Sequence, residues 1–169
     1  MSPIVDCQIQ FDTEKLIDCY NSVEIPKDFT YDQNQIAITS FDGKQLLVDS
    51  RFNEDYKRIP EADLNLLNEH FKDTYVEEVL NIINKRYKTT KWRFMRLTSE
   101  RRAYSYHNDE TKRLHIPLLT NDECMFIIEK QLYEMNHLGR MYEMDTTQHH
   151  TALNLGWTDR VHMVGAYSE

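Results

Sequence analysis

The chain has 169 residues, with 20 lysines and arginines against 28 aspartates and glutamates, and a formal net charge of -8. A length of roughly 100 to 200 residues is typical of one domain, and a hydrophobic share of 40% is enough for one core. The negative charge, without a cluster of lysines and arginines, argues against nucleic acid and against a charged membrane surface as partners.

The cysteines and the N-terminus predict a cytoplasmic protein. Cys7, Cys19 and Cys124 form neither a CxxC motif nor a metal-ligand spacing, which is typical of a reducing compartment. The N-terminus lacks the basic and apolar regions of a signal peptide, and no apolar run is long enough to span a bilayer. We therefore expect no targeting segment and no transmembrane helix.

The first 90 residues are predicted to form helices and a hairpin. Residues 11–23 carry apolar side chains at helical spacing, which predicts an amphipathic helix. The run 36–48 is rich in strand-forming residues and contains Asp42-Gly43, a strong hairpin signal. This region is expected to support the part of the chain that follows.

A second helical stretch is predicted over residues 61–87, with an interruption near Asp73. Thr74 and Glu77 have the spacing of a capping box, which indicates that a helix begins there. The expected buried stripe of this stretch consists of Leu64, Leu67, Phe71, Val76, Val79, Leu80 and Ile83.

The remainder, residues 91–167, is predicted to be almost entirely β-structure. Turn residues separate short alternating segments at a spacing typical of all-β domains. The expected strands are Trp92–Thr98, Ala103–His107, Arg113–Leu119, Cys124–Leu132, Arg140–Asp145, His150–Asn154 and Arg160–Ala166. Such a series predicts a sandwich or barrel, and the preceding helices can cover one of its faces. We therefore expect a single α+β domain over residues 1–169, in which 1–90 supports a β-core at 91–167.

Histidines concentrate in or beside these strands, where they are candidates for metal ligands. Because side chains at i and i+2 of a strand share a face, His107 and Asp109 can reach one point. With one further histidine they would complete the set of two histidines and one carboxylate found in non-haem Fe(II) oxygenases. The alternative is a histidine at a strand end beside a turn aspartate.

The third ligand is either His149 or His150. Alternation along a strand lets only one of the two face inward. Both faces of this strand contain a mixture of polar and apolar residues, so periodicity does not choose between them.

Two Arg-x-His pairs, Arg113 with His115 and Arg160 with His162, are candidates for anion binding. Each pair shares one strand face, with apolar residues on the other. An arginine inside a small barrel must be paired, and the carboxylates of an α-keto acid suit its planar, permanent charge. The alternative is that both pairs occupy the solvent-exposed faces of half-buried strands.

Five motifs in the same order resemble the aspartyl/asparaginyl β-hydroxylase family, to which bacterial proline hydroxylases are related. The motifs are Tyr104-Ser-Tyr-His107-Asn-Asp109, Lys112-Arg113-Leu-His115-Ile-Pro-Leu118, Tyr142-Glu-Met-Asp145-Thr-Thr147, His150-Thr-Ala-Leu-Asn154 and Asp159-Arg160-Val-His162-Met-Val164. The resemblance covers residues 92–166 and implies a double-stranded β-helix of the jelly-roll or cupin-like type, with the N-terminal helices packed on one face. It also implies an Fe(II)- and 2-oxoglutarate-dependent dioxygenase that consumes O2.

The resemblance also implies a role for individual residues. His107, Asp109 and His150 match the iron ligands, so that His150 rather than His149 is the expected third ligand. Arg160 matches the arginine that binds the distal carboxylate of 2-oxoglutarate, and Arg113 and His115 match a pair that lines the cosubstrate site. The loop between His107 and Arg113 is shorter here than in the family.

The expected activity is hydroxylation of an amino-acid side chain, either free or within a peptide or protein. The expected β-core ends close to Glu169, so we expect no C-terminal recognition domain, which favours a small substrate. One alternative is a non-catalytic cupin-like binding module, which would require solvent-exposed arginines at 113 and 160. Another is a metal enzyme of different chemistry, such as a zinc hydrolase, although no glutamate adjoins the triad as in an HExxH motif.

Overall fold

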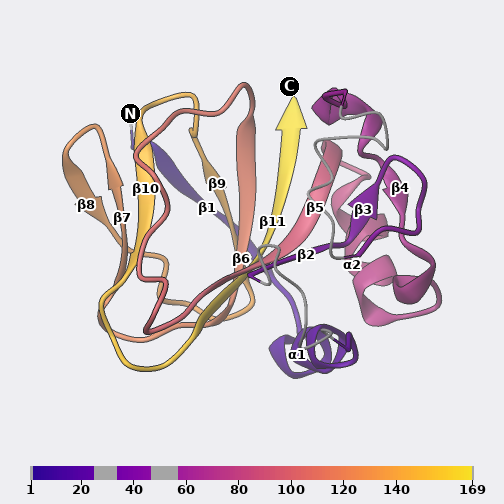
Figure 1. The fold of residues 1–169 in the computed structure, drawn as a ribbon, viewed down its shortest axis with the longest axis horizontal. Helices are drawn as coiled ribbons and strands as arrows, with labels where there is room; N and C mark the ends of the chain where they lie inside the picture. The colour runs from indigo at the N-terminus through magenta and orange to yellow at the C-terminus, as the bar shows by residue number, and fades with distance from the viewer. Residues whose placement is uncertain (1, 25–33, 47–56, 169) are drawn as a thin grey trace.

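The computed structural model describes residues 2–24, 34–46 and 57–168, which form a large and a small antiparallel sheet, a separate two-stranded sheet, and helices outside the large sheet (Figure 1). The strands are β1 Ile4–Gln10, β2 Gln35–Ala37, β3 Thr39–Ser40, β4 Leu66–Leu67, β5 Lys88–Leu97, β6 Lys112–Leu119, β7 Cys124–Ile128, β8 Gln131–Tyr133, β9 Arg140–Met144, β10 His150–Asn154 and β11 Arg160–Ser168. The helices are α1 Thr13–Asn21 and α2 Tyr75–Ile83, and two short 3-10 segments are η1 Glu61–Asp63 and η2 Glu69–Phe71.

The strand order is that of a jelly roll. The large sheet has the order β1-β9-β6-β11-β5-β2, and the small sheet has the order β10-β7-β8. After β5 the chain crosses to the small sheet, where Ala103 and His107 form bridges to β10, and then returns to the large sheet as β6. It continues through β7 and β8 in the small sheet, β9 in the large, β10 in the small and β11 in the large. This winding confirms the predicted α+β fold with a double-stranded β-helix, or cupin-like, core.

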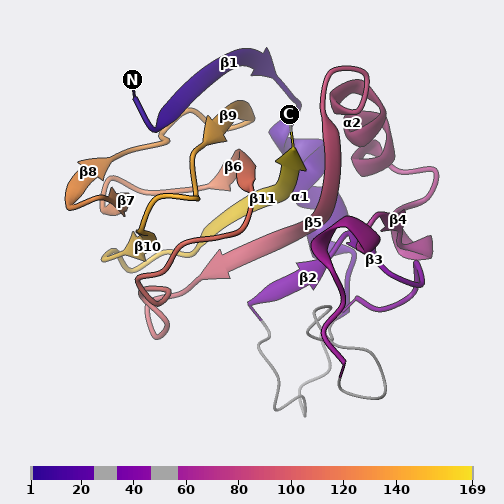
Figure 2. The same ribbon diagram turned by 90° about the horizontal axis from the view of Figure 1, so that it is seen from above.

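Both faces of the large sheet are buried at its centre, along β6 and β11. Along β6 and β11, alternate residues such as Leu114, Ile116 and Met163 join the core formed with Leu16 of α1 and Val79 of α2. Figure 2 shows both helices on the side of the large sheet that faces away from the small sheet. The residues that alternate with these core residues along β6 and β11 therefore point between the two sheets, into the barrel.

The N-terminal region contributes two strands to the large sheet: β1, which the sequence did not predict, and β2, which overlaps the start of the predicted hairpin run 36–48. β1 pairs with β9, and β2 pairs with β5, so they extend the large sheet at opposite edges. The expected hairpin at Asp42-Gly43 is a turn, with Gly43 at a φ of 69°, but β3 pairs with β4 instead of the segment after the turn. One backbone hydrogen bond, from Ala37 N to Leu46 O at 2.8 Å, joins the two sides of the turn. Residues 47 and 48 of the predicted run lie outside the described residues.

The prediction of helix over 61–87 was wrong in its first half. That half consists of η1, β4 and η2, because its backbone pairs with neighbouring segments: Lys91 N donates to Leu64 O at 2.7 Å. Helix α2 begins after Thr74 as predicted, but the capping differs. Glu77 accepts from the backbone N–H of Asp73 at 2.7 Å, while the hydroxyl of Thr74 donates to Phe71 O.

Two of the predicted strands also differ from the structure. The segment predicted as Cys124–Leu132 is divided by a tight turn in which Glu129 and Lys130 have positive φ angles of 44° and 67°. Residues 103–107 form only isolated bridges at their two ends. The seven predicted strands therefore become eight segments distributed over the two sheets, one of them irregular.

Candidate metal centre

His107 and His150 lie directly opposite each other across the irregular pass and β10. His107 N donates to His150 O at 3.0 Å, and His150 N donates to His107 O at 2.7 Å. A pair of this kind places both side chains on one face of the sheet, and the ring centroids are 4.7 Å apart. The fold therefore brings two imidazoles together from positions far apart in the sequence.

The same hydrogen-bonding arrangement orients both rings. Nδ1 of His107 lies 2.7 Å from Ser105 O, and Nδ1 of His150 lies 3.0 Å from Gln148 O. A carbonyl oxygen can only accept, so each Nδ1 carries the proton and each Nε2 presents a lone pair. This carbonyl-anchored tautomer is the one that metal-binding histidines typically adopt.

Asp109 completes a cluster of three ligand-type residues. Its backbone N–H donates to Thr146 O at 2.8 Å, and its Oδ1 lies 3.9 Å from Nε2 of His107. One ligand atom from each of Asp109, His107 and His150 lies within 4.8 Å of the others. The His107 side chain is 43% exposed whereas His150 is 7% exposed, so the centre lies at the mouth of the barrel. Burial lowers the pKa of His150, which keeps that imidazole neutral and able to bind a cation.

Arg113 links Asp109 to a buried carboxylate. Its Nε donates to Oδ2 of Asp109 at 3.0 Å, and its Nη1 and Nη2 donate to the two oxygens of Glu61 at 3.1 and 2.8 Å. Lys91 Nζ pairs with the same carboxylate. Burial raises the pKa of Glu61, but Arg113 and Lys91 together lower it to about 2. The guanidinium that was expected to line a cosubstrate site is thus balanced by two carboxylates of the chain.

His115 and His162 lie deeper in the barrel, with Phe126 of the small sheet. Both histidines are buried, and both have ring contacts with Phe126, with centroids 5.3 and 5.9 Å away. Burial, reinforced by the positive charge of Arg160, lowers the pKa of each well below its ordinary value. Nδ1 of His115 has no hydrogen-bond partner. These are neutral imidazoles in the interior rather than solvated ones.

Arg160 is a buried cation with no carboxylate partner among the residues that the structure describes. It is 2% exposed, its Nη2 donates to Nδ1 of His162 at 3.1 Å, and its guanidinium lies 4.8 Å from the ring centroid of Phe126. Burial lowers its pKa to about 10, so it remains charged at neutral pH. A buried charge without a counterion is costly, which makes this position suited to an anionic ligand.

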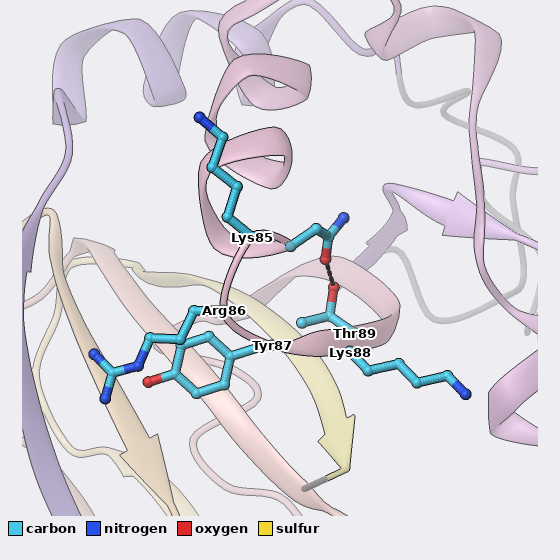
Figure 3. A pocket seen from close by; sticks show the side chains of 6 residues that line it. Lys85, Arg86, Tyr87, Lys88 and Thr89 are labelled. Atoms are coloured by element: carbon cyan, nitrogen blue, oxygen red, sulfur yellow. Dashed lines mark hydrogen bonds between the residues drawn. The ribbon is translucent and has the colours of Figure 1, made fainter.

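The other residues considered as candidates point elsewhere. His149 faces the opposite side from His150 and interacts with Glu129 through Nδ1 at 3.7 Å. A hollow of about 440 Å³ lies at the end of α2 and is lined by residues 84–89, including Lys85, Arg86 and Lys88 (Figure 3). It contains none of the metal-centre residues. Neither helix of the described chain has the length and apolarity that a membrane span requires.

No family model and no curated protein matches the sequence. Among solved structures, the chain is similar to a cupin-2 domain-containing protein from Shewanella frigidimarina, with 10% identity, a TM-score of 0.38, and coverage of 57% of this chain and 96% of that one. It is also similar to IDO from Bacillus thuringiensis, with 13% identity, a TM-score of 0.44, and coverage of 92% and 80%. The fold assignment rests on the strand order, and the chain is a cupin-like protein with a cluster of three residues able to hold a metal ion.

Proposed function

We propose that this protein is an Fe(II)- and 2-oxoglutarate-dependent dioxygenase, related to the aspartyl/asparaginyl β-hydroxylases, that hydroxylates an amino-acid side chain. The observation that carries the proposal is the combination of two features in one barrel. His107, Asp109 and His150 converge at its mouth, and the uncompensated guanidinium of Arg160 lies in its interior.

The donor set fits Fe(II). Two imidazoles and one carboxylate on one side of a metal leave open positions for a bidentate ligand and O2. When bound, iron and 2-oxoglutarate supply the oxidising power for hydroxylation, with succinate and CO2 as by-products. The carbonyl groups of Ser105 and Gln148 hold the imidazoles in the required tautomer.

The interior residues have roles toward the cosubstrate. Arg160 offers a permanent charge to the distal carboxylate, and the neutral His115 offers a hydrogen-bonding nitrogen without a competing partner. Arg113 holds Asp109 in place through Nε and is itself held by Glu61. We therefore assign Arg113 mainly to the positioning of the metal ligand.

The proposal is tested by titrating the apo-protein anaerobically with Fe(II) and then with 2-oxoglutarate. We expect a weak visible charge-transfer band to form when the keto acid chelates the metal. The band should be lost in His150→Ala and should require more 2-oxoglutarate in Arg160→Ala. His149→Ala is the matched control, because its imidazole is adjacent in sequence but faces away, and it should leave the band unchanged.

A wild-type protein that is folded and loaded with metal but gives no band would refute the dioxygenase assignment. The alternative of a binding module required solvated arginines, whereas Arg113 and Arg160 are both buried. The alternative of a zinc enzyme is distinguished by the same titration, because it predicts tight zinc binding and no response to 2-oxoglutarate.

A further inference from the structure

A second arginine that forms no ion pair within the described part of the chain, Arg93, lies on the inner face of β5. The strand register places Arg93 beside Val164 of β11, and Val164 beside His115 of β6. Their neighbours Phe94 and Met163 belong to the helix-covered outer core, so Arg93, Val164 and His115 form a row that faces the barrel interior. Arg93 was not among the site residues predicted from the sequence.

The contacts of Arg93 leave part of its guanidinium available. Nη1 donates to Oε1 of Gln35, on the neighbouring strand β2, at 2.7 Å. Nε is buried and has no hydrogen-bond partner, and no carboxylate of the described chain forms an ion pair with Arg93. A neutral amide holds the side chain in place without balancing its charge.

Arg93 is near the metal centre but is separate from the position of Arg160. Arg113, whose Nε pairs with Asp109, lies beside Ala166 of β11, two residues from the Val164 that lies beside Arg93. Burial and the charge of Arg113 lower the pKa of Arg93, while the carboxylate of Asp109 raises it. Arg160 lies beside Leu97, four residues further along β5 than Arg93. At about 3.3 Å per residue, the two backbone positions are separated by roughly 13 Å along the strand.

Two arginines inside the barrel are available to anionic ligands. Arg113 forms ion pairs with Asp109 and Glu61, whereas Arg93 and Arg160 form no ion pair with a carboxylate of the described residues. 2-Oxoglutarate has two carboxylates, of which one would chelate the metal and the other would pair with Arg160. Arg93 is then left to pair with a further carboxylate.

We propose that Arg93, held by Gln35, binds a carboxylate of the primary substrate, so that the substrate is an amino acid bearing a free carboxylate. This inference rests on the proposed function, because it assigns the cosubstrate to Arg160. The carboxylate is either the α-carboxylate of a free amino acid or the side-chain carboxylate of an acidic residue in a polypeptide. The same guanidinium chemistry serves both, and the experiment below distinguishes them.

The test measures binding without turnover. The protein is loaded anaerobically with Fe(II) and 2-oxoglutarate, and calorimetry follows titration with each L-amino acid, with their α-amides, and with N-acetylated α-amides of aspartate and glutamate. We expect at least one probe with a free carboxylate to bind and its counterpart without that carboxylate to bind at least tenfold more weakly. Binding by the free acids alone identifies the α-carboxylate, and binding by the blocked acidic probes identifies the side-chain carboxylate.

Variants of Arg93 connect the probe to the residue. In Arg93→Gln we expect the dissociation constant of that probe to rise by about 10- to 100-fold, the range for loss of a charged hydrogen-bonding partner. Arg93→Lys should retain part of the affinity because it keeps the charge. Arg96→Gln is the matched control, because Arg96 lies on the outer face of the same strand and pairs with Asp159. It should bind the probe as the wild type does.

Three results would overturn the inference. The first is that no probe binds although the charge-transfer band forms. The second is equal binding by wild type and Arg93→Gln. The third is that Arg93→Gln needs a higher concentration of 2-oxoglutarate to reach the midpoint of the charge-transfer titration, which would assign Arg93 to the cosubstrate. Absence of the band from the wild-type protein is a different result, because it refutes the proposed function itself.

Discussion

Replacing Glu61 by glutamine should destabilise the protein by an amount that depends on pH. Glu61 is the shared carboxylate of Arg113 and Lys91, and its side chain is 12% exposed. Its pKa falls from 4.5 to about 2 on folding. A fall in pKa of this size corresponds to about 3 kcal/mol of unfolding free energy at neutral pH.

The sign of the pH dependence follows from the direction of the shift. Because folding lowers the pKa, the unfolded chain takes up a proton first on acidification. The stabilisation is therefore complete above pH 4.5, declines below it, and is lost as the pH falls through about 2. Urea denaturation of wild type and Glu61→Gln at pH 7 should differ by about 3 kcal/mol, and the difference should narrow below pH 4.5.

A matched control separates this network from ordinary surface charge. Glu110 pairs with Arg58 on the surface, where both side chains are about two-thirds exposed. Glu110→Gln should change stability by less than about 1 kcal/mol. In Glu61→Gln, metal affinity should also fall by about 10- to 100-fold, because Arg113 would no longer be fixed behind Asp109. Equal stability at pH 7, or a difference that does not change with pH, would refute this reasoning.

Three other substitutions or conditions test other parts of the molecule. Arg160→Met should raise the melting temperature, because it removes a buried charge that has no counterion among the described residues. It should also abolish the further stabilisation that 2-oxoglutarate gives the iron-loaded wild type. A lower melting temperature would contradict this. Gly165→Ala should cost about 1 to 3 kcal/mol in urea denaturation, because its Cβ would overlap the ring of Trp92. Acidification should weaken metal binding, measured by competition with a chelator, at a pH below the ordinary histidine range, because burial lowers the pKa of His150.

The sequence predicted the β-core well because its signals are local. The bounds of β10 were predicted as the structure has them, and the alternation in β6 and β11 correctly separated the arginines and histidines from the apolar residues. Alternation identifies two faces but does not say which one is exposed. Here the polar face is inside, so the alternative interpretation of Arg113 and Arg160 as solvent-exposed residues was wrong.

The residues that the sequence did not identify depend on contacts between distant segments. Glu61 was placed in a predicted helix, and its partner Arg113 is 52 residues away. Arg93 lies between the apolar residues Trp92 and Phe94, a pattern that is typical of a half-exposed strand. The pairing of β2 with β5 is a long-range contact that the sequence does not reveal. It places Gln35 where it holds the guanidinium of Arg93 on the inner face of the sheet.

The distribution of polarity explains how one sheet can serve both stability and function. The outer face of the large sheet packs against α1 and α2 and forms the main apolar core, so it supplies much of the burial that stabilises the fold. The inner face contains Arg93, His115 and Arg160, each with hydrogen-bonding capacity or charge that the described chain leaves unmet. Such groups reduce stability until a ligand pairs with them. The stabilisation that ligands give should therefore come from the inner face, and it should decrease stepwise as these residues are replaced while the outer core is left intact.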